Sequence, residues 1–139
     1  MTSRRALQVL LSVIGLVALT FGTLSMILGP GAVADGGSTS VNVDSELRFY
    51  GAWYAAAGLV LLHSARRPES EGPAIRVVCV TFGLAGLARL LGIVLVGAPD
   101  PVFVALMVAE WVIPIVVIPW QASVAGSASD KEGSTVNGA

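Results

Sequence analysis

Long apolar segments dominate this chain of 139 residues. The first, from Ala6 to Leu28, contains no charged residue. As a helix it would be roughly 34 Å long, enough to cross a hydrocarbon core of about 30 Å. Hydrophobic residues make up 55% of the chain and charged residues only 12%, whereas a soluble domain has about 25% charged residues. The lipid bilayer is therefore the expected solvent of most of this chain.

The apolar segments predict four transmembrane helices, at about residues 6–28, 46–64, 75–96 and 101–120. They are predicted to be helices because transmembrane strands need only about 10 residues and alternate in polarity. The second apolar run, Phe49–Leu62, is short, so its span must include polar residues at both ends. Gly97–Asp100 leaves room only for a tight turn, so the third and fourth helices should be antiparallel neighbours. The predicted fold class is all-α, an antiparallel bundle of four transmembrane helices.

The arginines indicate how this bundle is oriented. Five of them flank one side of the predicted membrane: Arg4, Arg5, Arg66, Arg67 and Arg76. Since cytoplasmic flanks are enriched in Lys and Arg, both termini are predicted to be cytoplasmic, in a multi-pass protein of the cell (plasma) membrane. The loop Gly29–Ser45, rich in Gly, Ser and Asp, is expected to be a flexible outer connection. Residues 121–139 are polar and rich in small residues, and are expected to form a disordered cytoplasmic tail.

An alternative interpretation makes the first apolar segment a cleaved signal peptide. Arg4 and Arg5 precede it, and Ala32, Val33 and Ala34 resemble an A-x-A cleavage site. The uncharged run from Ala6 to Leu28 is much longer than the 7 to 15 residues of a signal peptide's apolar core. A membrane helix is therefore the favoured interpretation.

Two charged residues interrupt the third and fourth apolar segments. Arg89 precedes the turn at Gly97, and Glu110 follows Pro101 by a similar distance, so both should lie about 12 to 14 Å deep. An arginine at a helix centre costs about 2.5 to 3.5 kcal/mol and cannot release its proton, so it needs a partner. We therefore predict a salt bridge between Arg89 and Glu110. Small residues near Arg89, namely Ala85, Gly86 and Gly92, are expected to let another helix backbone approach.

The second predicted helix supplies further polar and aromatic residues. Glu46, Tyr50 and Trp53 fall within a narrow arc of this helix, Tyr54 flanks them, and Arg48 points to the opposite side. With Arg89, Glu110 and Trp111, these side chains predict an outward-facing polar pocket. The alternative is that the ion pair is structural and that Tyr50 and Trp53 are interfacial anchors. The candidate pocket or buried polar cluster comprises Glu46, Arg48, Tyr50, Trp53, Tyr54, Arg89, Glu110 and Trp111.

Other chemically active residues are few. Cys79 is the only cysteine, so the chain can form neither an intrachain disulfide nor a CxxC pair. His63 is the only histidine and lies at the end of an apolar stretch, as is typical of an interfacial residue. We predict no metal site and no cofactor, and the sequence indicates no nucleic-acid partner.

Several of these residues carry a family resemblance. Glu46 to Tyr50 with Trp53 and Tyr54, then Gly83 to Arg89, and finally Glu110 resemble a family of small bacterial four-helix integral-membrane proteins catalogued as a domain of unknown function. The resemblance covers roughly Arg5 to Trp120. It implies the fold and a bacterial inner-membrane location, but no reaction.

Three functions are consistent with these features. The favoured hypothesis is a membrane-embedded binding or accessory protein whose outward pocket holds a small amphipathic or lipid-like ligand. The second is an enzyme on a lipid-soluble substrate, with Glu110 or Glu46 as the acid or base; a tight bridge to Arg89 argues against Glu110. The third is a small proton-coupled exporter acting as a dimer. The expected partners are the lipid bilayer, the ligand, and a second copy or another membrane protein.

Overall fold

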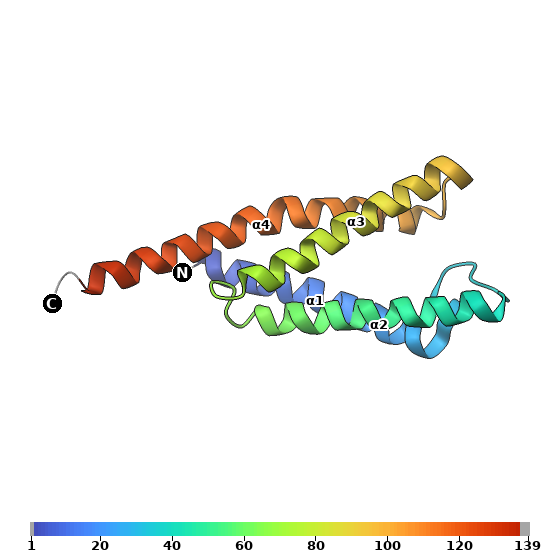
Figure 1. The fold of residues 1–139 in the computed structure, drawn as a ribbon, viewed down its shortest axis with the longest axis horizontal. Helices are drawn as coiled ribbons and strands as arrows, with labels where there is room; N and C mark the ends of the chain where they lie inside the picture. Colours follow the sequence, from blue (N-terminus) through green and yellow to red (C-terminus); the bar gives the residue numbers. More distant parts are fainter. Residues whose placement is uncertain (1, 137–139) are drawn as a thin grey trace. The chain divides into compact units, whose positions relative to one another are not determined.

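The computed structural model describes the backbone of residues 2–136 and the side chains of residues 3–129. In chain order the protein forms α1 (Thr2–Leu28), the short 3-10 helix η1 (Gly29–Ala32), α2 (Val41–Ser64), α3 (Gly72–Val96) and α4 (Pro101–Val136) (Figure 1). The described residues contain no β-strand, so the predicted all-α fold class is confirmed.

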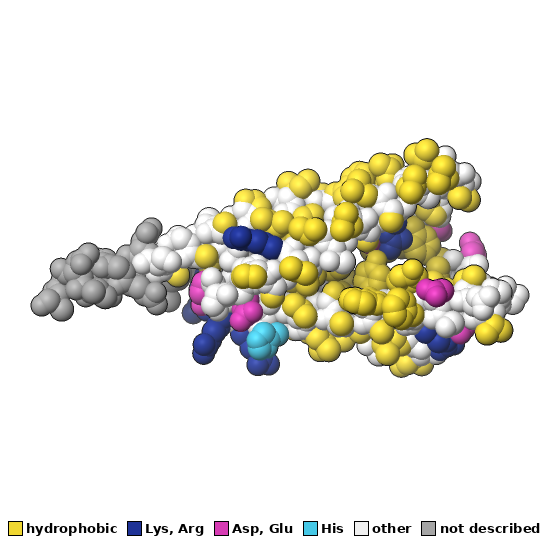
Figure 2. Space-filling view, in the orientation of Figure 1, with side chains coloured by type: hydrophobic (Ala, Val, Ile, Leu, Met, Phe, Trp, Pro, Cys, Tyr) yellow, Lys and Arg dark blue, Asp and Glu magenta, His cyan; other side chains and the backbone are white. Residues whose placement is uncertain are grey.

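Three of the helices are long and apolar enough to cross a bilayer. They are Ser3–Ala32, Gly72–Val96 and Pro101–Ser129. Hydrophobic side chains lie along much of the visible surface of α3 (Figure 2), and Leu84 of α3 is 61% exposed. Exposed apolar surface of this extent would drive association in water, whereas in lipid it faces the solvent. The chain is therefore built as a multi-pass membrane protein, and the crossing by α2 stays a prediction.

The start of α2 differs from the expected boundary. The loop was expected to extend to Ser45, but α2 already begins at Val41. The reason is local, because the Ser40 hydroxyl accepts a hydrogen bond from the Val43 amide at 3.4 Å and so caps the helix. Asp44 in the first turn adds a favourable negative charge at the helix N-terminus.

The end of α4 also differs from the expectation of a disordered tail. The helix does not stop at Trp120 but continues to Val136. Gln121 and Val124 are both buried, so the continuation packs against the rest of its unit in its first turn. Further along, the Ser127 hydroxyl donates to the Ser123 carbonyl four residues earlier, an interaction that a helical backbone permits.

The chain divides into two compact units. The α3–α4 unit contains Met1–Gln8 and Arg67–Ala139, so it includes the first turns of α1. The α1–α2 unit contains Val9–Arg66. Within each unit, two long helices run side by side (Figure 1).

Glycines bring α1 and α2 together without intervening side chains. A methyl group on Gly22 would clash with the Ala55 amide and lie 2.6 Å from the Gly51 carbonyl oxygen. A methyl group on Gly58 would lie 2.6 Å from the Gly15 carbonyl oxygen. Small residues at these positions allow the backbones to touch, which is how helices gain van der Waals contact in lipid. We call these four residues, Gly15, Gly22, Gly51 and Gly58, the glycine seam.

Candidate functional site

The loop between α3 and α4 fixes the register of the helical hairpin. Gly97 has a φ of +123°, which an L side chain rarely adopts. Asp100 then caps α4, because its carboxylate accepts a hydrogen bond from the Val102 amide at 2.9 Å. With both helix ends fixed, residues at equal distances from the turn must face each other. Two pairs follow this rule: the Trp111 side chain approaches Gly86, and the Pro114 side chain approaches Gly83.

The same register brings Arg89 and Glu110 together. The Arg89 Nε atom donates to both carboxylate oxygens of Glu110, at 3.1 and 3.0 Å. The predicted buried salt bridge is therefore confirmed. The Arg89 guanidinium also lies 5.7 Å from the centre of the Phe103 ring, within the range of a cation–π attraction. Each charge therefore has a partner of opposite sign between the two apolar helices, and neither is buried alone.

The two partners differ in exposure. The Glu110 side chain is 9% exposed, whereas the Arg89 side chain is 26% exposed. Glu110 is therefore the more enclosed partner of the pair. Trp111, next to Glu110, packs on Gly86, where a methyl group would lie 2.5 Å from the indole Nε1 atom.

The expectation about the small residues near Arg89 needs correction. Gly86 accommodates the Trp111 side chain rather than another helix backbone. Gly92 has no neighbouring heavy atom within 4 Å of the position of an added methyl group. The close backbone contact lies instead at the glycine seam. Its signal was readable in the sequence, because each helix contributes two glycines separated by the same interval of two helical turns.

Arg48 has a structural role in the α1–α2 unit. Its Nη1 atom donates to the carbonyls of Met26 and Ile27, at 2.8 and 2.9 Å. Its other nitrogens bind the Asp44 carboxylate at 2.8 and 3.1 Å. A cation at the last carbonyls of α1 satisfies acceptors that the helix leaves unpaired and complements its dipole. The hydrogen bond from Arg48 lowers the pKa of Asp44.

The remaining α2 candidates lie in two environments. Tyr54 packs edge to face against Phe21 of α1, with ring centres 5.5 Å apart. Tyr50 and Trp53 are exposed and both contact the Phe49 ring. Glu46 is exposed as well. The structure thus brings Arg89, Glu110 and Trp111 together in the α3–α4 unit, and a single pocket containing all eight candidates stays a prediction.

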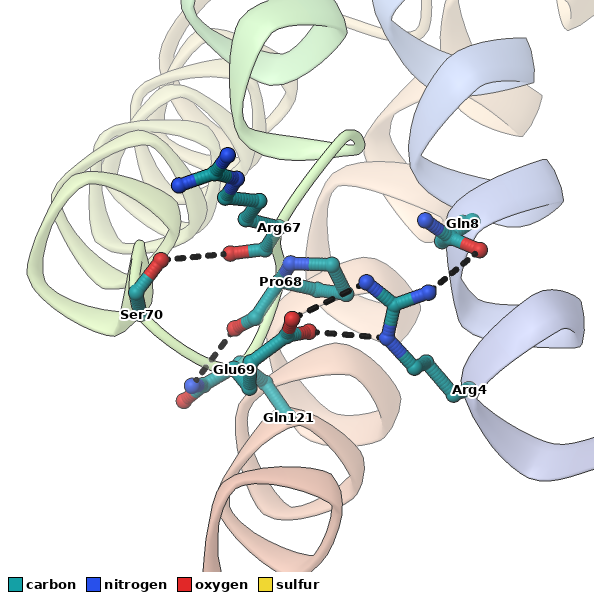
Figure 3. A network of polar contacts seen from close by, with 7 residues as sticks. All are labelled: Arg4, Gln8, Arg67, Pro68, Glu69, Ser70 and Gln121. Atoms are coloured by element: carbon teal, nitrogen blue, oxygen red, sulfur yellow. Dashed lines mark hydrogen bonds and ion pairs between the residues drawn. The ribbon is translucent and has the colours of Figure 1, made fainter. Parts of the chain in front are cut away.

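A second polar cluster, at the opposite end of α3 from the Gly97 turn, was not predicted from the sequence. We call it the Gln121 cluster; it contains Arg4, Pro68, Glu69, Arg76 and Gln121. All of these residues except Arg76 are drawn in Figure 3. Gln121 is only 1% exposed and donates to the Pro68 carbonyl at 3.0 Å. Its side-chain oxygen accepts from the Arg76 Nη2 atom at 3.4 Å. No local pattern marks Gln121 as buried, because its partners lie far away in the sequence.

Arg4 and Glu69 close this cluster. The guanidinium donates from two nitrogens to the two carboxylate oxygens, at 3.0 and 2.9 Å (Figure 3). Gln8 accepts a further hydrogen bond from Arg4 at 3.4 Å. The hydrogen bonds from Arg4 hold the pKa of Glu69 below its ordinary value. Bidentate geometry of this kind fixes orientation as well as charge, so it ties the start of α1 to the segment before α3.

No group of three His, Cys, Asp or Glu side chains that could hold a metal ion comes together within residues 3–129.

The fold defines the class of this protein as a multi-pass membrane protein. It is all-helical, three of its helices are apolar and long enough to cross a membrane, and an ion pair joins two of them. Residues 6–121 match the family described as Domain of unknown function (DUF4345). The chain belongs to this family. Comparisons with curated proteins and with solved structures gave no match.

Proposed function

We propose that this protein is a four-span membrane protein with both termini in the cytoplasm, which binds a small amphipathic or lipid-like molecule at the Arg89–Glu110 pair. The observation that carries the proposal is the unequal exposure of the two partners, 26% for the Arg89 side chain against 9% for Glu110. Enclosing both charges completely would carry a larger desolvation cost, and in this pair only the carboxylate is nearly enclosed. An arginine that keeps some exposure can meet the polar head of a ligand while Glu110 holds it in place.

The four-span arrangement has two supports. The helix α2, Val41–Ser64, would be roughly 36 Å long and could cross the bilayer if its polar first turns lie among the headgroups. The family match begins at residue 6 and so includes nearly all of α1. This favours α1 as a part of the domain over a removable signal peptide. The basic residues around the α2–α3 connection then favour a cytoplasmic location for both termini.

The neighbours of the pair suit an amphipathic ligand. Phe103 places an aromatic ring beside the guanidinium, and the Trp111 indole packs on Gly86 of the facing helix. Binding sites for small molecules are commonly apolar surfaces with a few fixed polar groups. The ligand's acceptor atoms would face Arg89, and its apolar part would lie along the hydrophobic faces of α3 and α4.

The two alternative functions need a carboxylate that changes its protonation readily. In an enzyme, that group would be the acid or base; in a proton-coupled exporter, it would carry the proton. Glu110 is poorly suited to both, because both of its carboxylate oxygens accept hydrogen bonds from the Arg89 Nε atom, at 3.1 and 3.0 Å, and are therefore already engaged. Glu46 remains available to an enzyme, but the described contacts place no second catalytic group beside it.

The test is native mass spectrometry of the purified protein with its lipids retained. We expect the wild-type chain to carry a defined small molecule, which the Glu110→Gln variant loses because an amide no longer holds the guanidinium in position. The matched control is Glu69→Gln, since Glu69 is also paired with an arginine in the same unit. The control should keep the molecule. An empty wild-type protein, or a molecule retained equally by Glu110→Gln, would contradict the proposal.

A further inference from the structure

An exposed aromatic face of α2 is a second candidate site, independent of the Arg89–Glu110 pair. Phe49, Tyr50 and Trp53 are 55%, 56% and 65% exposed. The Phe49 ring centre lies 5.6 Å from that of Tyr50 and 6.2 Å from that of Trp53, at interplanar angles of 65° and 73°. Rings that meet edge to face are not stacked in parallel, so they do not cover one another's faces.

A carboxylate lies on the same face of the helix. Glu46 precedes the three aromatic residues by three, four and seven positions, the spacing that places side chains on one side of a helix. Glu46 is exposed, and within residues 3–129 no side chain forms a hydrogen bond or ion pair with it.

Arg48, two residues after Glu46 in the chain, is paired with other groups. Arg48 is directed to Asp44 and to the last carbonyls of α1. The face formed by Glu46, Phe49, Tyr50 and Trp53 therefore combines a negative charge with electron-rich ring faces. We call it the α2 aromatic face.

We propose that the α2 aromatic face binds the ammonium headgroup of a zwitterionic phospholipid. Cations are attracted to the faces of Trp, Tyr and Phe, and aromatic cages are a common way of recognising quaternary ammonium groups. Glu46 adds charge complementarity to the cation and repels an anionic headgroup. Tyr and Trp are also enriched at the depth where headgroups lie. The inference requires that α2 meets the headgroup layer, as in the proposed four-span arrangement, but it requires no function of Arg89 or Glu110.

The experiment compares two lipids with identical acyl chains on the full-length protein. Delipidated protein in detergent is titrated with phosphatidylcholine or with phosphatidylglycerol, and the bound fraction is measured by native mass spectrometry. The variants are Trp53→Leu, which keeps an apolar side chain, and Glu46→Gln, which removes only the charge. The matched control is Leu59→Ala, a change at an exposed residue further along α2 (57% exposed). Circular dichroism checks that every variant keeps its helix content.

We expect the wild-type protein to bind phosphatidylcholine about fivefold more tightly than phosphatidylglycerol, as one exposed cation–π contact would give. Trp53→Leu and Glu46→Gln should each reduce this preference, whereas Leu59→Ala and Glu110→Gln should leave it unchanged. The last variant separates this site from the proposed ligand site. A wild-type protein without preference would overturn the inference. So would a Trp53→Leu variant that loses affinity for both lipids equally, because the rings would then be interfacial anchors only.

Discussion

The two units of this protein hold their helices together by different means. In the α1–α2 unit, the backbones touch along the glycine seam. In the α3–α4 unit, side chains make the contact: an ion pair, an indole ring over Gly86 and a buried glutamine. Lipid offers no hydrophobic gain for helix association, so helices must rely on close packing or on polar bonds. The α1–α2 unit uses mainly the first means, and the α3–α4 unit uses both.

This difference has a functional consequence. A glycine seam leaves no polar group for a ligand to contact. An ion pair, in contrast, places charge inside an apolar region, where it can be used for recognition as well as for packing. The proposed ligand site accordingly lies in the α3–α4 unit, and the α1–α2 unit is interpreted as a scaffold that carries the α2 aromatic face.

The largest expected effect comes from removing one charge of the pair. Glu110→Leu leaves the Arg89 guanidinium without its carboxylate, and we expect the free energy of unfolding to fall by about 3 to 5 kcal/mol. Arg89→Met should cost less, because an unpaired glutamate can take up a proton whereas an unpaired arginine cannot release one. Reversible denaturation in mixed micelles measures both. An equal or greater loss for Arg89→Met would contradict a charged pair in an apolar environment.

The glycine seam should be the next most sensitive feature. Gly22→Ala introduces a methyl group that clashes with the Ala55 amide, and we expect a loss of about 1 to 3 kcal/mol in the same assay. Gly92→Ala is the matched control, because an added methyl group there meets nothing within 4 Å. The control should be neutral or stabilising by up to about 1 kcal/mol, the gain in helix propensity. Equal losses in the two variants would mean that the seam is not a close contact.

A smaller loss is expected in the Gln121 cluster. Gln121→Leu removes the hydrogen bond to the buried Pro68 carbonyl, and an unpaired buried acceptor costs about 1 to 3 kcal/mol, part of which the larger apolar contact offsets. Ser123→Ala is the control, because Ser123 is exposed and its hydroxyl donates to the Trp120 carbonyl of its own helix. The control should stay within about 0.5 kcal/mol of wild type. An unchanged Gln121→Leu variant would remove the argument that α4 packs beyond Trp120.

The smallest expected effect is the pH dependence from Glu69. Folding lowers the pKa of this carboxyl below its ordinary value of 4.5, chiefly through the hydrogen bonds from Arg4. The unfolded chain therefore binds the proton more readily. The Arg4–Glu69 pair therefore contributes its full stabilisation at pH values above the ordinary pKa of Glu69. This stabilisation is lost as the pH falls through the lower pKa that Glu69 has in the folded protein. Thermal unfolding between neutral pH and about pH 3 should show a loss that is weaker in Glu69→Gln. Identical profiles for the two proteins would contradict this contribution.

The sequence could predict the features that depend on chain length and on charge in an apolar segment. The tight turn before Pro101 places Arg89 and Glu110 at the same depth, and the cost of an isolated arginine predicts their pairing. The Gln121 cluster could not be predicted from the sequence. Gln121 is polar, follows the last apolar residues and forms its hydrogen bond with Pro68, which is far away in the chain. Arg48 was assigned to the correct side of α2, but its bonds to the α1 carbonyls depend on how closely the glycines let the helices approach.

The most direct test of the ligand site is a charge-swapped double variant, Arg89→Glu with Glu110→Arg, measured for both stability and ligand retention. Each single change should destabilise the protein, and the double change should restore much of the stability because opposite charges again face each other. The account predicts that the double variant does not regain the co-purifying molecule, since the exposed position then carries a carboxylate. Recovery of both stability and ligand would contradict the account and would make the Arg89–Glu110 pair purely structural.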